Sequence, residues 1–370
     1  MKMGLVLHMY LLETASHEDW PINLLLITIP DEEEVGSAGM RAAVKDMVKL
    51  REQHNLEYTL FLNSEPSFSQ PPQDENYHIY SGTIGKIMPS ALFYGRETHA
   101  GEPLSGINAH YMASFMTRRM EYTPDFTEEV FCEKTPLPIC LKTYDLKQDY
   151  STQTSNHATA LYNVFLMKSN ASSIMAKFKD IADESMKACQ LQYEDICYKE
   201  NVQPVGKIKV LDYSELMDYT IRKLGNNTVE DEMSIHICDE VDGSVPRACA
   251  SCRTVLCTAV LPCYQFIRES IGSKKIIETQ RILQDNFLIE AKQVHYFNGI
   301  SDLSYVNYDK GDMGWKSFKD NLPVWESVYS IPFEEMQALQ APVLNIGPFG
   351  KNAHKLTERL HSAFEQHRTF

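Results

Sequence analysis

The first sixty residues alternate between helical and strand-like patterns of apolar positions. Residues 4–15 have the pattern of a mostly buried helix, and residues 22–29 are almost continuously apolar, as expected of a strand covered on both faces. After Ser37, a good N-cap, apolar residues recur at helical spacing through about residue 54. A second strand is predicted over 57–62. This order of elements is typical of an α/β sheet.

The middle of the chain predicts a separate unit. Its elements are a strand in IMPSALFYGRETHAG, a helix in SGINAHYMASFMTRRM, strands over 138–147 and 158–167, a helix over 171–194, and a strand in VGKIKVLDY. This order indicates a small antiparallel α+β unit inserted at 88–212. Residues 1–87 and 213–370 would then form the α/β domain, which ends in a last strand, a Gly-rich turn and a terminal helix in APVLNIGPFGKNAHKLTERLH.

Composition narrows the class of protein. The 370 residues are 43% apolar, enough for a large core and two domains. A net charge of −15 argues against a nucleic-acid or anionic-membrane binder. No apolar run has the length of a membrane span, and the N-terminus lacks the features of a signal peptide. Nine cysteines, an odd number, favour reduced thiols, so we expect a cytoplasmic protein.

Four of the cysteines cluster between residues 249 and 263. Only Cys249 and Cys252 have the close spacing of a structural zinc pair, and the surrounding CRTVLCTAVLPC is apolar and lacks glycine. Small buried side chains on a core element are therefore favoured over a zinc module.

Acidic residues and a histidine follow three of the strand-like segments. Asp31–Glu34 come after the first, Glu65 after the second, and the last leads through Gly347–Gly350 to His354. In open α/β sheets, functional groups collect beyond the carboxyl ends of strands. If these strands are neighbours, the side chains form a site for zinc, manganese or cobalt. A run of four acids is otherwise more often a solvated loop.

His99 stands between a predicted strand and helix, flanked by Gly95 and Gly101. Such a histidine could polarise a developing oxyanion. Equally, it could be a loop residue that caps the helix over 104–120.

The order of several motifs resembles the M20-type zinc metallopeptidase and aminoacylase family. The motifs are PDEEEVGSAGM, EPS, GRETHAGEPLSGINA and NIGPFGKNAHKLTERL. FNGISDLSYV and IGPFGKNAHKLTER look most like the RocB-type arginine-degradation branch. The resemblance implies a catalytic domain with a mixed sheet and flanking helices, plus an inserted ferredoxin-like lid. It also implies two zinc ions, with cobalt or manganese as alternatives, a small amino-acid or peptide-like substrate, and a homodimer formed through 88–212.

The resemblance also assigns roles to residues. Glu33 would be the general base, and Glu34, Glu65 and His354 would be metal ligands. His99 would match the lid histidine that reaches a partner's active site and stabilises an oxyanion. The run has one acid more than usual, so Glu32–Glu33 is the alternative pairing.

Two features depart from the family pattern. The family's His-x-Asp segment and metal-bridging Asp would lie before Met1, so we expect an N-terminally incomplete catalytic domain with weak or no hydrolysis and at most one poorly held metal. The lid stretch NHATALYNVFLMKSN lacks the family's arginine, and Lys168 is the nearest cation. The sequence therefore predicts a hydrolase of amide bonds in small amino-acid or peptide derivatives. An inactive homologue with a binding or dimerisation role is the alternative.

Overall fold

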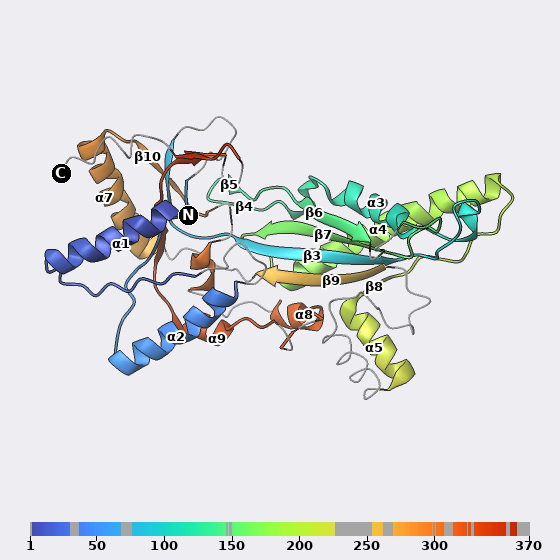
Figure 1. The fold of residues 1–370 in the computed structure, drawn as a ribbon, viewed down its shortest axis with the longest axis horizontal. Coiled ribbons are helices and arrows are strands. Elements are labelled where there is room, and N and C mark those ends of the chain that lie inside the picture. Colours follow the sequence, from blue (N-terminus) through green and yellow to red (C-terminus); the bar gives the residue numbers. More distant parts are fainter. Residues whose placement is uncertain are drawn as a thin grey trace.

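The structure is a computed structural model in which two β-sheets dominate an elongated molecule (Figure 1). It describes residues 2–29, 37–67, 76–145, 147, 150–225, 254–261, 269–297, 299, 301–306, 314–323, 325–326, 329–352 and 356–360. Within these residues no helix is long and apolar enough to cross a membrane.

The smaller sheet has four strands and mixed direction. Its order is β1 (Phe61–Asn63), β11 (Val343–Asn345), β2 (Tyr77–Tyr80) and β10 (Ala291–Val294). β1 runs parallel to β11 and β10 parallel to β2, whereas β11 and β2 are antiparallel. The helices of this unit are α2 (Ala38–His54), α7 (Glu269–Phe287) and α9 (Phe333–Ala338). The expected mixed sheet with flanking helices is confirmed.

The larger sheet has five strands in the order β6 (Ile139–Asp145), β7 (His157–Leu166), β3 (Gly85–Tyr94), β9 (Thr254–Leu261) and β8 (Val210–Asp212). Together with α3 (Ala109–Met120) and α4 (Ala171–Lys199), the chain order β3-α3-β6-β7-α4-β9 is that of a ferredoxin-like unit. The predicted strand near 205–213 is present as β8, but it is a parallel edge strand. The fourth antiparallel strand is β9, so the sheet extends beyond the boundary expected at residue 212.

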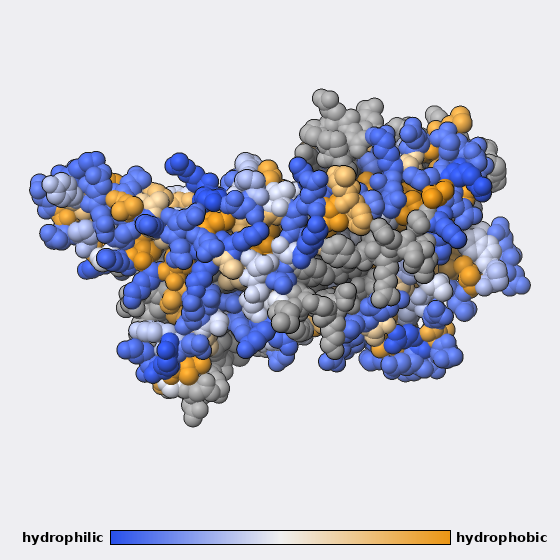
Figure 2. Space-filling model, turned by 180° about the vertical axis from the view of Figure 1, so that it is seen from behind, coloured by the Kyte–Doolittle hydropathy of each residue, from blue (hydrophilic) through white to orange (hydrophobic). Residues whose placement is uncertain are grey.

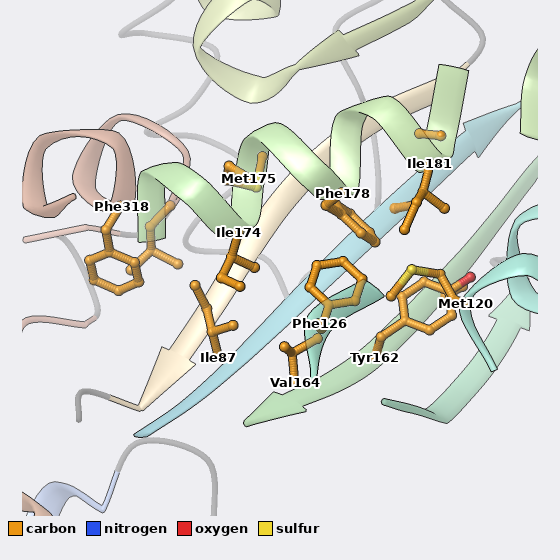
Figure 3. Packing of buried hydrophobic residues seen from close by; sticks show 14 of the residues in the cluster. Ile87, Met120, Phe126, Tyr162, Val164, Ile174, Met175, Phe178, Ile181 and Phe318 are labelled. Atoms are coloured by element: carbon orange, nitrogen blue, oxygen red, sulfur yellow. The ribbon is translucent and has the colours of Figure 1, made fainter. Parts of the chain in front are cut away.

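The core of this unit lies between the sheet and its two helices (Figure 3). α4 begins with a capping box, in which the Asn170 side chain accepts from Ser173 N and Ser173 Oγ binds back. Phe178 on α4 is fully buried and meets Tyr162 of β7 edge to face, with ring centroids 5.8 Å apart. The same cluster continues through Phe318 of α8 (Trp315–Asp320) and into α2, so one apolar core joins the two sheets.

The N-terminal region differs from its prediction. Residues 4–15 are helical, within α1 (Lys2–His17), but their apolar side chains are largely exposed. Residues 22–29 form no strand and are mostly exposed. A strand needs a neighbour for its backbone hydrogen bonds, and no described residue pairs with this segment. The opposite face of the molecule also shows apolar patches on a mainly hydrophilic surface (Figure 2).

Short elements complete the described chain. They are η1 (Pro103–Ser105), η2 (Pro124–Phe126), β4 (Glu129–Val130), β5 (Glu133–Lys134), α5 (Tyr213–Leu224), η4 (Asp302–Tyr305), β12 (Gly350–Lys351) and β13 (Arg359–Leu360). A terminal helix was expected after the Gly-rich turn. Within 356–360 the structure instead has a turn and β13, which pairs antiparallel with β12.

Candidate active site at the ends of strands β1 and β11

Glu65 lies just beyond β1, at the edge of the sheet where the parallel strands β1 and β11 end together. Asn63 and Asn345 are register partners, and Ile346 N continues the pairing to Asn63 O at 3.0 Å. Further on, Ser67 N donates to Pro348 O, also within a parallel arrangement. The predicted neighbourhood of the second and the last strand is therefore present, and Glu65 is half-buried beside the Gly347–Gly350 turn.

The approach of the two chains at Glu65 requires a glycine. A Cβ added to Gly347 would overlap the Glu65 carbonyl oxygen. Any side chain would therefore push the turn away from Glu65.

Two asparagine side chains take over the hydrogen bonds where the strands end. Asn63 Oδ1 accepts from Ser64 N at 2.8 Å, and Asn345 Oδ1 accepts from Glu65 N at 2.8 Å. The Asn345 side chain is fully buried. These amides satisfy backbone donors that have left the sheet ladder, so they fix the direction in which Glu65 leaves β1.

α1 packs onto the same strand end. His8 Nε2 and Ser64 Oγ share a hydrogen bond of 2.7 Å, and a Cβ on Gly4 would lie 2.6 Å from Ser64 O. Burial lowers the pKa of His8 from its usual value, because the charged form would lose solvation. Burial therefore favours the neutral form of His8, which bonds to Ser64, the residue just before Glu65.

The other expected ligands cannot be compared with Glu65. Glu33, its alternative partner Glu32, Glu34 and His354 all lie outside the described residues. Within the described part of the chain, no group of three or more His, Cys, Asp or Glu could hold a metal ion. Glu65 is thus the one expected ligand whose position is known among the described residues. A half-buried carboxylate oxygen suits zinc, manganese or cobalt.

His99 lies on an exposed loop of the five-stranded unit, away from its helix N-terminus. Its Nδ1 accepts a hydrogen bond of 3.0 Å from Gly101 N, so the ring proton is assigned to Nε2. The loop is held by Ala100 N, which donates to Thr152 O, and by Thr154 N, which donates to Thr98 O. The helix α3 is capped by Asn108 instead, whose side chain accepts from His110 N. The capping alternative for His99 is therefore wrong.

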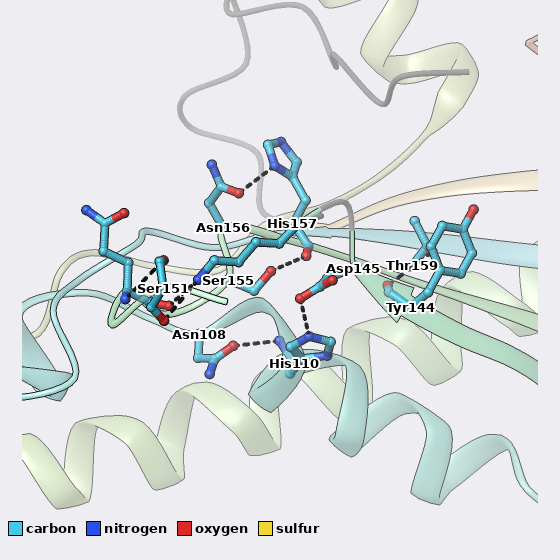
Figure 4. A network of polar contacts seen from close by, with 11 residues as sticks. Asn108, His110, Tyr144, Asp145, Ser151, Ser155, Asn156, His157 and Thr159 are labelled. Carbon is cyan, nitrogen blue, oxygen red and sulfur yellow. Dashed lines mark hydrogen bonds and ion pairs between the residues drawn. The ribbon is translucent and has the colours of Figure 1, made fainter. Parts of the chain in front are cut away.

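A polar network joins the start of α3 to strands β6 and β7 (Figure 4). His110 Nε2 donates to Asp145 Oδ2 at 3.1 Å, linking the start of α3 to the end of β6. The hydrogen bond from His110 holds the pKa of Asp145 below its usual value. Ser155 Oγ donates to His157 O at 2.6 Å in the strand beside it.

The structure describes Lys168 and one member of the cysteine cluster, Cys257. Lys168 is exposed at the end of β7, and its Nζ donates to Glu129 O at 3.1 Å. Cys257 lies in β9, where its register partner is Ser90 of β3. Cys249, Cys252 and Cys263 lie outside the described residues.

Sequence reasoning missed the asparagines and His8. The available signal was a repeated pair, Leu62-Asn63 and Leu344-Asn345, at the ends of two strands. One further triplet, His17-Glu18-Asp19, has the spacing of the family's His-x-Asp segment but is exposed at the far end of α1. It lies roughly 13 Å beyond His8 along the helix, at a rise of 1.5 Å per residue.

No family model matches the chain. The uncharacterized protein YqjN of Bacillus subtilis is 34% identical over 389 residues, which cover 98% of this chain and 70% of YqjN. Protein RocB of the same organism is 25% identical over 401 residues, which cover 99% of this chain and 69% of RocB.

Solved structures give more distant similarities. Aminopeptidase PepT from Bacillus cereus has a TM-score of 0.39 at 10% identity, covering 90% of this chain and 68% of that one. A tripeptidase from Staphylococcus aureus has a TM-score of 0.41 at 11% identity, covering 86% and 56%. The identity to YqjN, in contrast, extends over nearly the whole chain, and so the chain belongs to the protein family that contains YqjN and RocB.

Proposed function

We propose that this chain is a metal-dependent hydrolase of amide bonds in small amino-acid or peptide derivatives, of the M20 type. The observation that supports this most is the parallel pairing of β1 with β11, with Glu65 beside the turn that leads toward His354. Two segments 280 residues apart in the chain thereby approach each other at a carboxyl-terminal sheet edge, where such sites form. The motif order found in the sequence supplies the remaining residues.

In this proposal Glu34, Glu65 and His354 bind metal, with two zinc ions expected from the M20-type resemblance and cobalt or manganese as alternatives. A bound metal would polarise the scissile carbonyl and make water more acidic. Glu33 takes the proton from the attacking water and delivers it to the leaving amine.

His99 has the donor that its proposed role needs. Because Gly101 N donates to Nδ1, the ring proton is on Nε2, and in this proposal Nε2–H donates to an oxyanion. The role requires that the histidine reach a partner's site, so we further propose a cytoplasmic homodimer formed through the unit expected at 88–212. The likeness to the RocB-type branch favours substrates of arginine or related nitrogen catabolism.

Metal binding tests the ligand assignment. The chain is titrated with Zn²⁺ and with Co²⁺, and bound metal is measured by mass spectrometry and by the cobalt absorption spectrum. We expect Glu65→Ala and Glu34→Ala to lose metal, and Glu57→Ala, an exposed acid before the same strand, to retain it. Metal content that survives both ligand changes but is lost in Cys249→Ser would place the site at the cysteines instead.

Hydrolysis of N-acetyl amino acids and dipeptides tests the general base. Glu33→Gln is expected to lower turnover by roughly 10²–10⁴-fold, the usual contribution of a general base. Glu32→Gln serves as the matched control. The reverse result would shift the pair by one residue, and unchanged turnover in both variants would contradict the proposed base.

A binding or dimerisation protein without catalysis is the second candidate. The exposed apolar side chains of α1 and of 22–29 favour it, because such surface is normally covered by further polypeptide. Absence of turnover, together with no metal bound at Glu65, would support this candidate over the hydrolase.

A further inference from the structure

The β4–β5 hairpin reaches from the five-stranded unit to the end of strand β10 in the other sheet (Figure 1). Its base is closed by Glu128 N, which donates to Thr135 Oγ1, and by Thr135 N, which donates to Glu128 O. Its two strands pair at Glu129–Lys134 and Val130–Glu133. The hairpin is therefore anchored at its base to the five-stranded unit, and its tip contacts the four-stranded sheet.

One carboxylate ties the base of the hairpin to the end of β7. Glu128 Oε2 accepts from Met167 N at 2.7 Å and from Lys168 N at 2.5 Å, and its Oε1 accepts from Ser169 N at 3.0 Å. Charged acceptors make hydrogen bonds about twice as strong as neutral ones. The base therefore moves with the five-stranded sheet.

A second carboxylate ties the tip to the four-stranded sheet. His295 N donates to both carboxylate oxygens of Glu133, at 3.0 and 3.1 Å, and His295 Nδ1 donates to Oε1 at 2.7 Å. The Phe131 ring stacks on the His295 ring, with centroids 4.3 Å apart and planes within 16°. Tyr296 OH donates to Lys134 O. Burial, followed by the nearby Glu133 charge, raises the pKa of Tyr296 to about 12, so this donor stays protonated.

The turn of the hairpin is strained. Phe131 and Cys132 are consecutive non-glycine residues with φ of 53° and 62°. A two-residue turn of this kind normally uses Asn-Gly, because residues with larger side chains are strained at positive φ. Such strain persists only where the surrounding contacts hold the backbone in place. Here the strained turn places the Phe131 ring on His295, so this contact is one that holds it.

On the side opposite the hairpin, apolar contact between α4 and α8 joins the two units. In Figure 1 the hairpin lies above the five-stranded sheet and α8 lies below it. α8 packs on α4, with Phe318 buried beside Ile174 (Figure 3). A Cβ on Gly314 would be 2.8 Å from Ala171 N, so the two helices meet closely at their starts. Apolar contact of this kind is not directional, and so it tolerates small rotations better than a set of aimed hydrogen bonds.

We propose that the β4–β5 hairpin is a polar clasp that fixes the angle between the two sheets, with the α4–α8 contact as the pivot opposite it. Glu133 and His295 are its positioning residues. When the clasp opens, the five-stranded unit rotates about the pivot and the β7 end separates from the β10 end. His99 and Glu65 lie on different units, so if both serve the proposed reaction, the clasp also sets the reach of the His99 loop.

The distance between the two units tests the clasp. A donor and an acceptor dye are attached through unnatural amino acids at Tyr122 and Leu288, which are exposed on the five-stranded unit and at the end of α7. Single-molecule energy transfer then gives the distance distribution. Glu133→Gln keeps the size of the side chain but removes the charge that accepts from His295, and we expect a longer and broader distribution.

Glu129→Gln is the matched control. It removes a charge from the same hairpin, but the Glu129 carboxylate bonds to Lys134 Nζ of that hairpin, at 3.5 Å, and its side chain is 53% exposed. Its distribution should equal that of the parent. In the double variant Glu133→Gln/His295→Gln, the distance between the dyes should not exceed the larger of the distances in the two single variants. Both changes break the same contact, so their effects should not add.

A Glu133→Gln distribution that coincides with that of the parent would overturn the clasp. If this variant does not fold, Phe131→Ala removes the ring stacking and leaves the carboxylate, and a smaller lengthening is expected. An unchanged distribution in Phe131→Ala would then overturn the proposal. Neither readout depends on metal or turnover, so the clasp and the proposed hydrolase can fail separately.

Discussion

Helices α1 and α4 both carry many apolar residues but have different surroundings. α4 buries Ile174, Phe178 and Ile181 against the five-stranded sheet. In α1, Met9 and Tyr10 are 56% and 63% exposed. Periodicity in the sequence therefore fixes that a helix forms and which stripe is apolar, but burial needs a complementary surface. The comparison predicts that α4 contributes strongly to stability and that the outer face of α1 contributes little.

The largest effect is expected in α4. Phe178→Ala should lower the free energy of unfolding by about 3–5 kcal/mol, because it opens a cavity in a fully buried cluster. Chemical denaturation measures this directly. Tyr10→Ala on α1 is the control, expected to stay within about 0.5 kcal/mol as for an exposed site. Equal losses in the two variants would remove the contrast between the helices.

A change on the outer face of α1 should affect association more than stability. Val6→Glu with Met9→Lys replaces exposed apolar side chains by an oppositely charged pair one turn apart. We expect weaker binding of a hydrophobic dye and less self-association in sedimentation, with the unfolding free energy within about 1 kcal/mol of the parent. A loss above about 2 kcal/mol would show that this face is buried in solution.

The same contrast explains which parts of the fold the sequence could predict. In the five-stranded unit, strands 138–147 and 158–167 and the helix over 171–194 correspond closely to β6, β7 and α4, since each packs on elements nearby in the chain. The fourth strand was assigned to residues near 205–213, although β9 takes that place. Both segments suit a strand, and the choice between them depends on pairing with β3, which local pattern does not encode.

Only part of the candidate site could be predicted in this way. The position of Glu65 after the second strand is readable from the sequence, and the structure pairs β1 in parallel with β11. The structure does not test the ligand roles of Glu34, Glu65 and His354 or the base role of Glu33, which stay predictions. Asn345 could not be identified because its bond to Glu65 N joins residues 280 positions apart.

The smallest expected effect concerns the anchor of α1 at His8. Burial lowers the pKa of His8 in the folded chain, so the unfolded chain takes up a proton first as the pH falls through the unperturbed value of 6.5. Stability is then full above pH 6.5 and decreases below it, until the folded state is protonated as well. His8→Gln removes this proton uptake, so the decline in unfolding free energy between pH 7.5 and 5.5 should be less steep than in the parent. His17→Gln, at the exposed end of the same helix, should keep the parent slope. If denaturation gives identical slopes for the parent and His8→Gln, the contact with Ser64 does not hold α1 in solution. The inner face of α1 would then contribute as little to stability as its outer face.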